Sequence, residues 1–116
     1  MKLIISLNRK ERLYDYVSMG IDCFILGGQY SFYAPSYFSL DDISQMVKQY
    51  PQCSFYVAVN ALYDEHEIEA VEAYIDALSK MATHGILFQD FGVLQIVKNK
   101  GYHFDMMYAP ETLNTN

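Results

Sequence analysis

The sequence is poor in cationic residues and contains no long apolar run. Lysine and arginine together number 8 against 14 aspartates and glutamates, which gives a formal net charge of -6. Proteins that bind a nucleic-acid backbone need clustered Lys and Arg, so nucleic acid is not indicated as a partner. No apolar stretch approaches the roughly 18 residues that span a bilayer, so we expect no membrane partner either.

Cysteine is also scarce, since the chain contains only Cys23 and Cys53. Two thiols cannot form a structural zinc site by themselves, and no histidine stands at a metal-ligand spacing from either of them. The amino-terminal apolar segment is too short for the hydrophobic region of a signal peptide, so we expect a cytoplasmic protein with reduced thiols. Cys23 lies inside an apolar run and is expected to be a small core residue.

Five short apolar runs occur along the chain, each bounded by residues typical of turns or helix caps. They are rich in Ile, Leu, Val, Phe and Tyr with little alternation, which is typical of strands buried on both faces of a parallel sheet. The runs are residues 2–6, 22–27, 54–60, 85–89 and 103–107.

Helical patterns fill the intervals between these runs. The first begins at Asn8, which has Glu11 at the capping-box spacing, and it ends at Gly20. The second begins at Ser39 and ends before Pro51, which cannot continue a helix. The apolar face of the first helix is expected to consist of Leu13, Tyr16, Val17 and Met19.

The third helical pattern has the clearest apolar stripe. It begins after Asp64 as the cap and ends before Gly85, and the fourth pattern runs from near Asp90 to Gly101. At helical spacing, the third stripe contains Ile68, Val71, Ile75, Leu78 and Ala82.

Strict alternation of strands and helices predicts an α/β protein with a parallel sheet and right-handed crossovers. Two folds suit this order. One is a partial (β/α)8 TIM-type barrel with five strands and four helices, and the other is an open doubly wound flavodoxin-like sheet. The phospho-acceptor receiver domain, a member of the second class, needs an acidic cluster after the first strand and an Asp after the third. Ser6 and Asn8 end the first strand here and Asn60 ends the third, so receiver chemistry is excluded.

In both folds a ligand binds at the carboxyl ends of the strands. The loop after the second run, residues 29–39, has eleven residues, five of them Tyr or Phe, whereas such loops usually have two to six. Gln29 and Tyr33 in this loop are candidate substrate-binding residues. The alternative is that the aromatic side chains of the loop only cover the end of the sheet.

Polar residues follow the other runs. Asn60 ends the third run, where its amide could bind a ligand or hold the neighbouring loop, and Glu111 follows the fifth run as a further candidate. Gln89 is a candidate for substrate binding. Asp90 is the only obvious general base, although its position also suits a helix N-cap. The acidic segment around His66 is best explained by a solvated helix face, so we expect no metal site.

Five segments of the sequence indicate a protein family by their order and spacing. They are GIDCFILGG, a loop ending in YFSLDDI, FYVAVNAL, GILFQDFGVLQIVK and YAPETLNTN. In this order they resemble the amino-terminal part of the U32, or collagenase-like, peptidase family, and the resemblance covers nearly all of the chain.

The resemblance implies a barrel-type catalytic domain of roughly twice this length or more, of which residues 1–116 would be the amino-terminal portion. Family members are described as peptidases, and some take part in hydroxylation of RNA bases or quinones, in part with iron–sulfur clusters. Cys23 and Cys53 match no cluster motif, so no cofactor is expected. An Arg that the family usually has in the loop after the second strand is replaced here by Tyr33, which leaves the substrate class open.

Three functions are therefore compatible with the sequence. The first is a fragment of a U32-type peptidase that is inactive by itself. The second is a non-catalytic α/β module that self-associates, most simply as a homodimer through the open edges of its sheet. The third is part of an enzyme that hydroxylates RNA bases or quinones. Cysteine clusters encoded further along the gene would distinguish this function from that of a peptidase.

Overall fold

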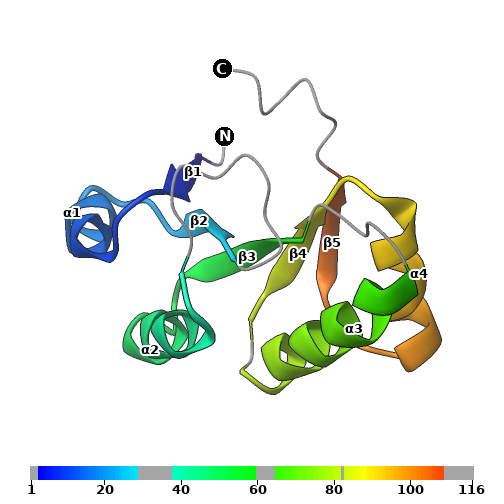
Figure 1. Ribbon diagram of the computed structural model, residues 1–116. Helices are drawn as coiled ribbons and strands as arrows, with labels where there is room; N and C mark the ends of the chain where they lie inside the picture. Colours follow the sequence, from blue (N-terminus) through cyan, green and yellow to red (C-terminus); the bar gives the residue numbers. More distant parts are fainter. Residues whose placement is uncertain (1–2, 29–37, 60–64, 82, 109–116) are drawn as a thin grey trace.

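The computed structural model describes residues 3–28, 38–59, 65–81 and 83–108. In this part of the chain, strands and helices alternate as the sequence predicts (Figure 1). The strands are β1 (Ile4–Leu7), β2 (Cys23–Gly27), β3 (Ser54–Val59), β4 (Gly85–Phe88) and β5 (Asp105–Tyr108). The helices are the short 3-10 helix η1 (Lys10–Arg12), α1 (Leu13–Ser18), α2 (Leu40–Gln49), α3 (Glu65–Lys80) and α4 (Phe91–Lys100).

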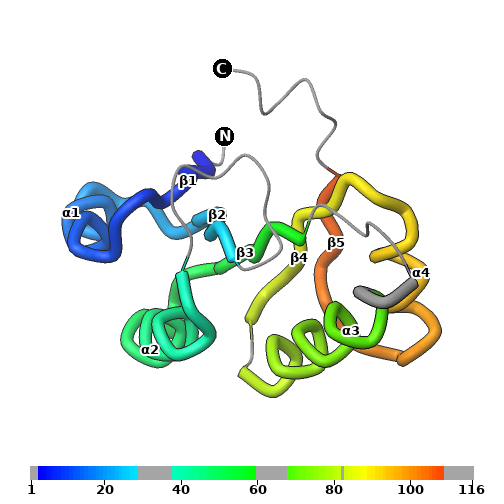
Figure 2. The backbone as a smooth tube through the Cα atoms, in the orientation of Figure 1, coloured from blue at the N-terminus to red at the C-terminus, as the bar shows by residue number. Residues whose placement is uncertain are grey.

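The strands form one parallel sheet in the order β1-β2-β3-β4-β5. Figure 2 shows them side by side in a curved row, and Figure 1 shows the helices along one side of that row. A doubly wound sheet reverses its strand order at a switch point, whereas a barrel adds each strand next to the previous one. The parallel α/β fold is therefore confirmed, and its strand order is that of the barrel.

The main core lies between the sheet and the helices. Alternate residues of the strands, such as Phe24, Phe55 and Val57, are at most 1% exposed. The helices contribute buried residues at helical spacing, because each helix lays one apolar face on the sheet. From α2, α3 and α4 these residues are Ile43, Met46, Val71, Ile75, Leu78, Val93 and Val97.

The other face of the sheet carries a smaller apolar cluster of Ala58 and Leu87, with Ile25 and Met107 packed against it. Residues in register on neighbouring parallel strands point to the same face, so this cluster marks the interior face of the curved sheet. The same face carries a row formed by Ser6, Ile25, Tyr56, Gly85 and Asp105, one residue from each strand. We call this set the interior row.

The first helical segment differs from the prediction. The structure begins it with η1, whose N-cap is Arg9, so the helical segment starts one residue later than the predicted cap at Asn8. Leu7 explains the shift, because it continues β1 and is buried at 3% exposure. Met19 was expected on the apolar face but is 71% exposed after the end of α1. The predicted stop at Gly20 is confirmed by its positive φ of 93°.

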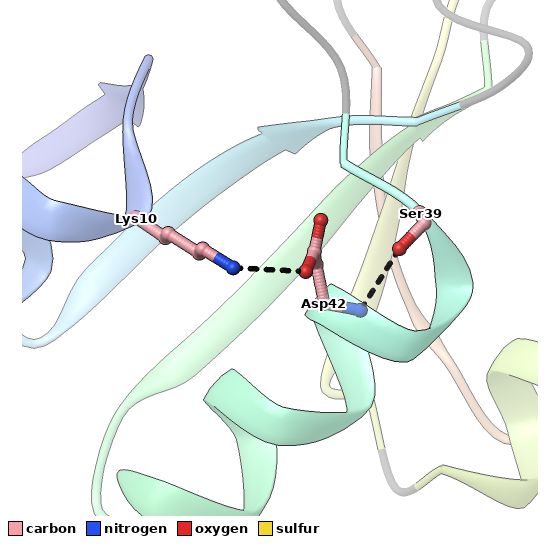
Figure 3. A network of polar contacts seen from close by, with 3 residues as sticks. All are labelled: Lys10, Ser39 and Asp42. Atoms are coloured by element: carbon pink, nitrogen blue, oxygen red, sulfur yellow. Dashed lines mark hydrogen bonds and ion pairs between the residues drawn. The ribbon is translucent and has the colours of Figure 1, made fainter.

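The cap of α2 agrees with the prediction in detail. Ser39 Oγ accepts a hydrogen bond of 3.1 Å from the backbone N–H of Asp42 (Figure 3). The Asp42 carboxylate then lies 3.3 Å from Lys10 Nζ of η1, so a single residue joins the two helical segments. Burial raises the pKa of Asp42, but the hydrogen bond and charge of Lys10, with the bonds from Ser39, outweigh this and leave the pKa below its usual value.

The remaining helix boundaries follow the predicted signals where the structure describes them. The α4 helix ends at Gly101, which adopts a left-handed φ of 73°. Residues 64 and 82, the predicted cap and last stripe residue of α3, lie outside the described residues. Within the described ranges, no helix has the length and apolarity needed to cross a bilayer.

Candidate functional site at the carboxyl ends of the strands

The five parallel strands end along one edge of the sheet, where the sequence predicts a site. The described residues at this edge include Asn8, Gly28, Gln89, Asp90 and Tyr108. The predicted substrate-binding residues Gln29, Tyr33, Asn60 and Glu111 lie outside the described residues, so their part in the site stays a prediction.

Asp90 is the N-cap of α4. Its Oδ1 accepts a hydrogen bond of 2.8 Å from the backbone N–H of Gly92. The cap orients the side chain, because the carboxylate is tied to the first turn of the helix while its backbone is still extended at φ -95° and ψ 122°. The capping role predicted as the alternative for Asp90 is therefore confirmed, and its role as a general base stays a prediction.

Gln89 precedes this cap and is half-buried. Its side-chain Nε2 is buried from solvent and has no hydrogen-bond partner in the part of the chain that the structure describes. The only other buried side-chain atom of this kind in the described ranges is Thr83 Oγ1, which precedes β4 at the other end of the sheet. An unsatisfied buried donor costs about 1–3 kcal/mol. Gln89 is therefore a donor for which a ligand oxygen would be a suitable partner.

An aromatic cluster adjoins these polar residues. The rings of Phe91 and Tyr108 stack with centroids 5.4 Å apart and an interplanar angle of 20°. Phe88 contacts both rings, at 5.8 Å from Phe91 and 5.6 Å from Tyr108. Phe91 is 63% exposed and Tyr108 is 50% exposed, so the stack presents an apolar surface to solvent at the strand ends.

Phe91 is a residue that sequence reasoning missed. It stands between the candidate Asp90 and the apolar stripe of α4, where it looks like an ordinary first-turn residue. One signal in the sequence could have identified Phe91. It lies just after the end of one predicted strand, and the aromatic residue Tyr108 lies at the end of the next strand. Only the register of β4 and β5, which pairs Phe88 with Tyr108, brings the three rings together.

Gly28 closes the same edge after β2. A Cβ atom there would collide with the hydroxyl group of Tyr74 from α3, so a side chain at this position would displace a buried residue. Gly28 is therefore explained by close packing of α3 against the end of β2.

The described residues form neither a metal centre nor an activated thiol. Within them, no group of three His, Cys, Asp or Glu side chains could hold a metal ion. Both cysteines are free, and Cys23 is buried as predicted at 2% exposure. Burial, together with nearby Asp22 and Cys23, raises the pKa of the Cys53 thiol, which is the opposite of what a nucleophilic thiolate requires.

Sequential parallel strands, helices on one side and a polar and aromatic edge at the carboxyl ends define an α/β protein of the βα-repeat class. The profile of Peptidase family U32 matches residues 8–116. The chain therefore belongs to Peptidase family U32, and the resemblance inferred from its sequence is confirmed. No curated protein and no solved structure matches the chain.

Proposed function

We propose that this chain is the amino-terminal portion of a longer U32 peptidase domain, a collagenase-like hydrolase, and that its carboxyl strand edge binds a peptide substrate. The observation that carries this proposal is the buried, unpartnered Nε2 of Gln89 next to the capped Asp90. A peptide carbonyl oxygen is the complementary acceptor, and a bond to it would remove the cost of the unsatisfied donor.

The neighbouring groups have chemistry that suits the same substrate. The Asp90 carboxylate is held by the α4 cap and has a second oxygen, which would accept a proton from an attacking water. The exposed stack of Phe91 and Tyr108 offers flat apolar faces, on which the proline rings of a collagen-like peptide would pack. Residues 29, 33, 60 and 111 are the predicted remainder of this site.

The 116-residue chain is expected to bind such a peptide but not to cleave it. Active sites at the top of a barrel draw residues from several strand ends, and a closed barrel has eight strands where the described chain has five. Cleavage of gelatin or casein by the purified chain, abolished by Asp90→Asn, would overturn this expectation. Asn is as good an N-cap as Asp, so this variant removes the base while retaining the helix cap.

Binding itself is tested with a proline-rich gelatin peptide by isothermal titration calorimetry. Gln89→Ala should weaken binding by about tenfold, because the lost bond is made in a buried setting. Gln95→Ala, the same change at an exposed position of α4, should leave binding unchanged. The proposal fails if both variants bind alike or if the chain shows no affinity for the peptide.

A second candidate function is self-association, for which the sheet edges provide a specific observation. In the described structure β1 pairs only with β2, and β5 pairs only with β4. Leu3 and Ile4 at the β1 edge are 60% and 39% exposed. An unpaired edge with apolar side chains tends to recruit another strand, so we propose a two-fold homodimer through these edges.

We also propose a cytoplasmic location. The thiol state of both cysteines supports it, since the cytoplasm keeps thiols reduced.

A further inference from the structure

A groove of about 640 Å³ lies between α2 and α3. Its walls include Cys53 before β3 and His84 before β4, so it is at the amino ends of the strands, opposite the candidate peptide site. Both helices are internal to the βα series, and the groove therefore lies between two neighbouring repeats rather than at an edge of the sheet.

The floor of the groove is apolar. Val47 of α2, Phe55 of β3 and Met81 after α3 line it, together with Ala77. Phe55 is 1% exposed, so the groove reaches down to the core residues of the sheet. Pockets of this size with apolar walls and a few polar groups are typical of small-molecule sites.

The rim of the groove is cationic, although the chain as a whole has a net charge of -6. Lys48 and Lys80 are among the lining residues, and no Asp or Glu is among the described residues that line it. Lys80 Nζ is 3.0 Å from Asp76 Oδ2, and His84 Nε2 is 3.8 Å from Asp105 Oδ2. Lys48 is exposed, and no described residue forms an ion pair or hydrogen bond with its amine.

We propose that this groove binds a medium-chain monocarboxylate. The carboxylate pairs with Lys48 Nζ, and the hydrocarbon tail lies on Val47, Phe55 and Met81. One negative charge matches the site because one of its two lysines already has an anionic partner. This site is separate from the peptide edge, so the proposal stands whether or not the chain takes part in peptide cleavage.

The first test is a chain-length series of hexanoate, octanoate and decanoate, titrated into the purified 116-residue chain below the micelle concentration. Each buried methylene should tighten binding by about fourfold. Methyl decanoate and decylamine have similar tails without the negative charge and should bind about fivefold more weakly or worse. Affinity that is independent of tail length, or equal for decylamine and decanoate, would overturn the proposal.

Matched variants test the two halves of the site. Lys48→Gln should weaken decanoate binding by about fivefold, whereas Lys98→Gln, the same change at an exposed position of α4, should not. Equal effects of the two variants would mean that decanoate responds only to the net charge of the protein, and this would refute the site. Ala77→Leu fills the groove with a residue of nearly equal helix propensity and should abolish binding, with an unchanged circular dichroism spectrum as the control for folding.

Cys53 provides an independent reading of occupancy. It lines the groove and is partly exposed, while the other thiol, Cys23, is buried. Alkylation of Cys53 by iodoacetamide at about pH 9, where part of the thiol is ionised, should lose most of its rate when decanoate is saturating. Methyl decanoate should need a concentration about fivefold higher or more to give the same protection. If decanoate binds but leaves the alkylation rate unchanged, it binds elsewhere and the assignment to this groove is wrong.

Discussion

The hydroxyl group of Tyr56 in β3 donates a hydrogen bond to the carboxylate of Asp105 in β5, across the intervening strand β4. Both residues belong to the interior row, in which β4 contributes Gly85. The absence of a side chain at Gly85 leaves room for the tyrosine ring over β4. The imidazole of His84 meets this ring edge-on at a centroid distance of 5.2 Å. A single side chain therefore ties the edge strand β5 to the middle of the sheet.

Tyr56→Phe should lower the free energy of unfolding by about 1 kcal/mol, the usual value of one hydrogen bond. The ring stays in place, so the loss reports the hydroxyl group alone. The measurement is urea unfolding followed by circular dichroism. Tyr102→Phe removes a comparable bond of 2.8 Å to Asp76 from a tyrosine that is only half-buried, and it should have a smaller effect. An equal or larger effect of Tyr102→Phe would contradict the structural importance of the interior bond.

The contribution of Tyr56 should depend on alkaline pH. Burial and then the hydrogen bond to Asp105 raise the pKa of the phenol above its usual value of 10.0. Below this value the phenol is protonated in both the folded and the unfolded chain, so its stabilising contribution is fully present. As the pH rises past 10.0 the unfolded chain loses the proton first, and the contribution is progressively lost. The stability difference between wild type and Tyr56→Phe should therefore be smaller at about pH 11 than at about pH 8. A difference that grows with pH would show that the phenol ionises more easily in the folded chain.

Gly85→Ala should be more damaging than an ordinary glycine substitution. A Cβ atom at this position would overlap the backbone oxygen of Asp105 and the ring of Tyr56. Backbone cannot move aside cheaply, so we expect a loss of about 2–3 kcal/mol in thermal or urea unfolding. Gly101→Ala is the control, since a Cβ there meets no atom within 4 Å but must adopt a φ of 73°. It should cost about 1 kcal/mol, and a larger loss than for Gly85→Ala would refute the packing argument.

Ser39→Ala should lower stability by about 1 kcal/mol, because it removes the side chain that accepts from the Asp42 N–H at the start of α2. Ser44→Ala is the matched control, a partly exposed serine inside the same helix, and it should be neutral or slightly stabilising. Urea unfolding measures both. Equal losses for the two variants would mean that the cap contributes nothing specific.

Self-association through the sheet edge should be visible by light scattering coupled to gel filtration. We expect a dimer mass for the wild-type chain and a monomer mass for Leu3→Lys, because a charge on the β1 edge opposes strand pairing. Met19→Lys places the same charge at another exposed apolar residue, after α1, and should leave the dimer intact. A monomeric wild type over the micromolar range, with a thermal transition independent of concentration, would rule out the dimer.

Local signals in the sequence were sufficient for most elements. The Ser39 cap and the Gly101 stop involve atoms within three or four residues of each other. Both can therefore be recognised from a short stretch of sequence. The parallel strands were predicted because their sequences lack polar alternation. This pattern is typical of strands that are buried on both faces of a sheet. The predicted helix start at Asn8 was one residue early, because burial of Leu7 extended β1 and moved the helix start.

The candidate site was predicted in part, for the same physical reason. Asp90 and Gln89 follow a strand directly, and their position is visible in the sequence. The stack of Phe91 on Tyr108, the bond from Tyr56 to Asp105 and the groove between α2 and α3 join residues that are far apart along the chain. Their contacts depend on strand register and on the placement of neighbouring helices. The sequence by itself determined which segments are strands and helices and the family of the chain, while the pairing of strands in three dimensions decided which side chains meet.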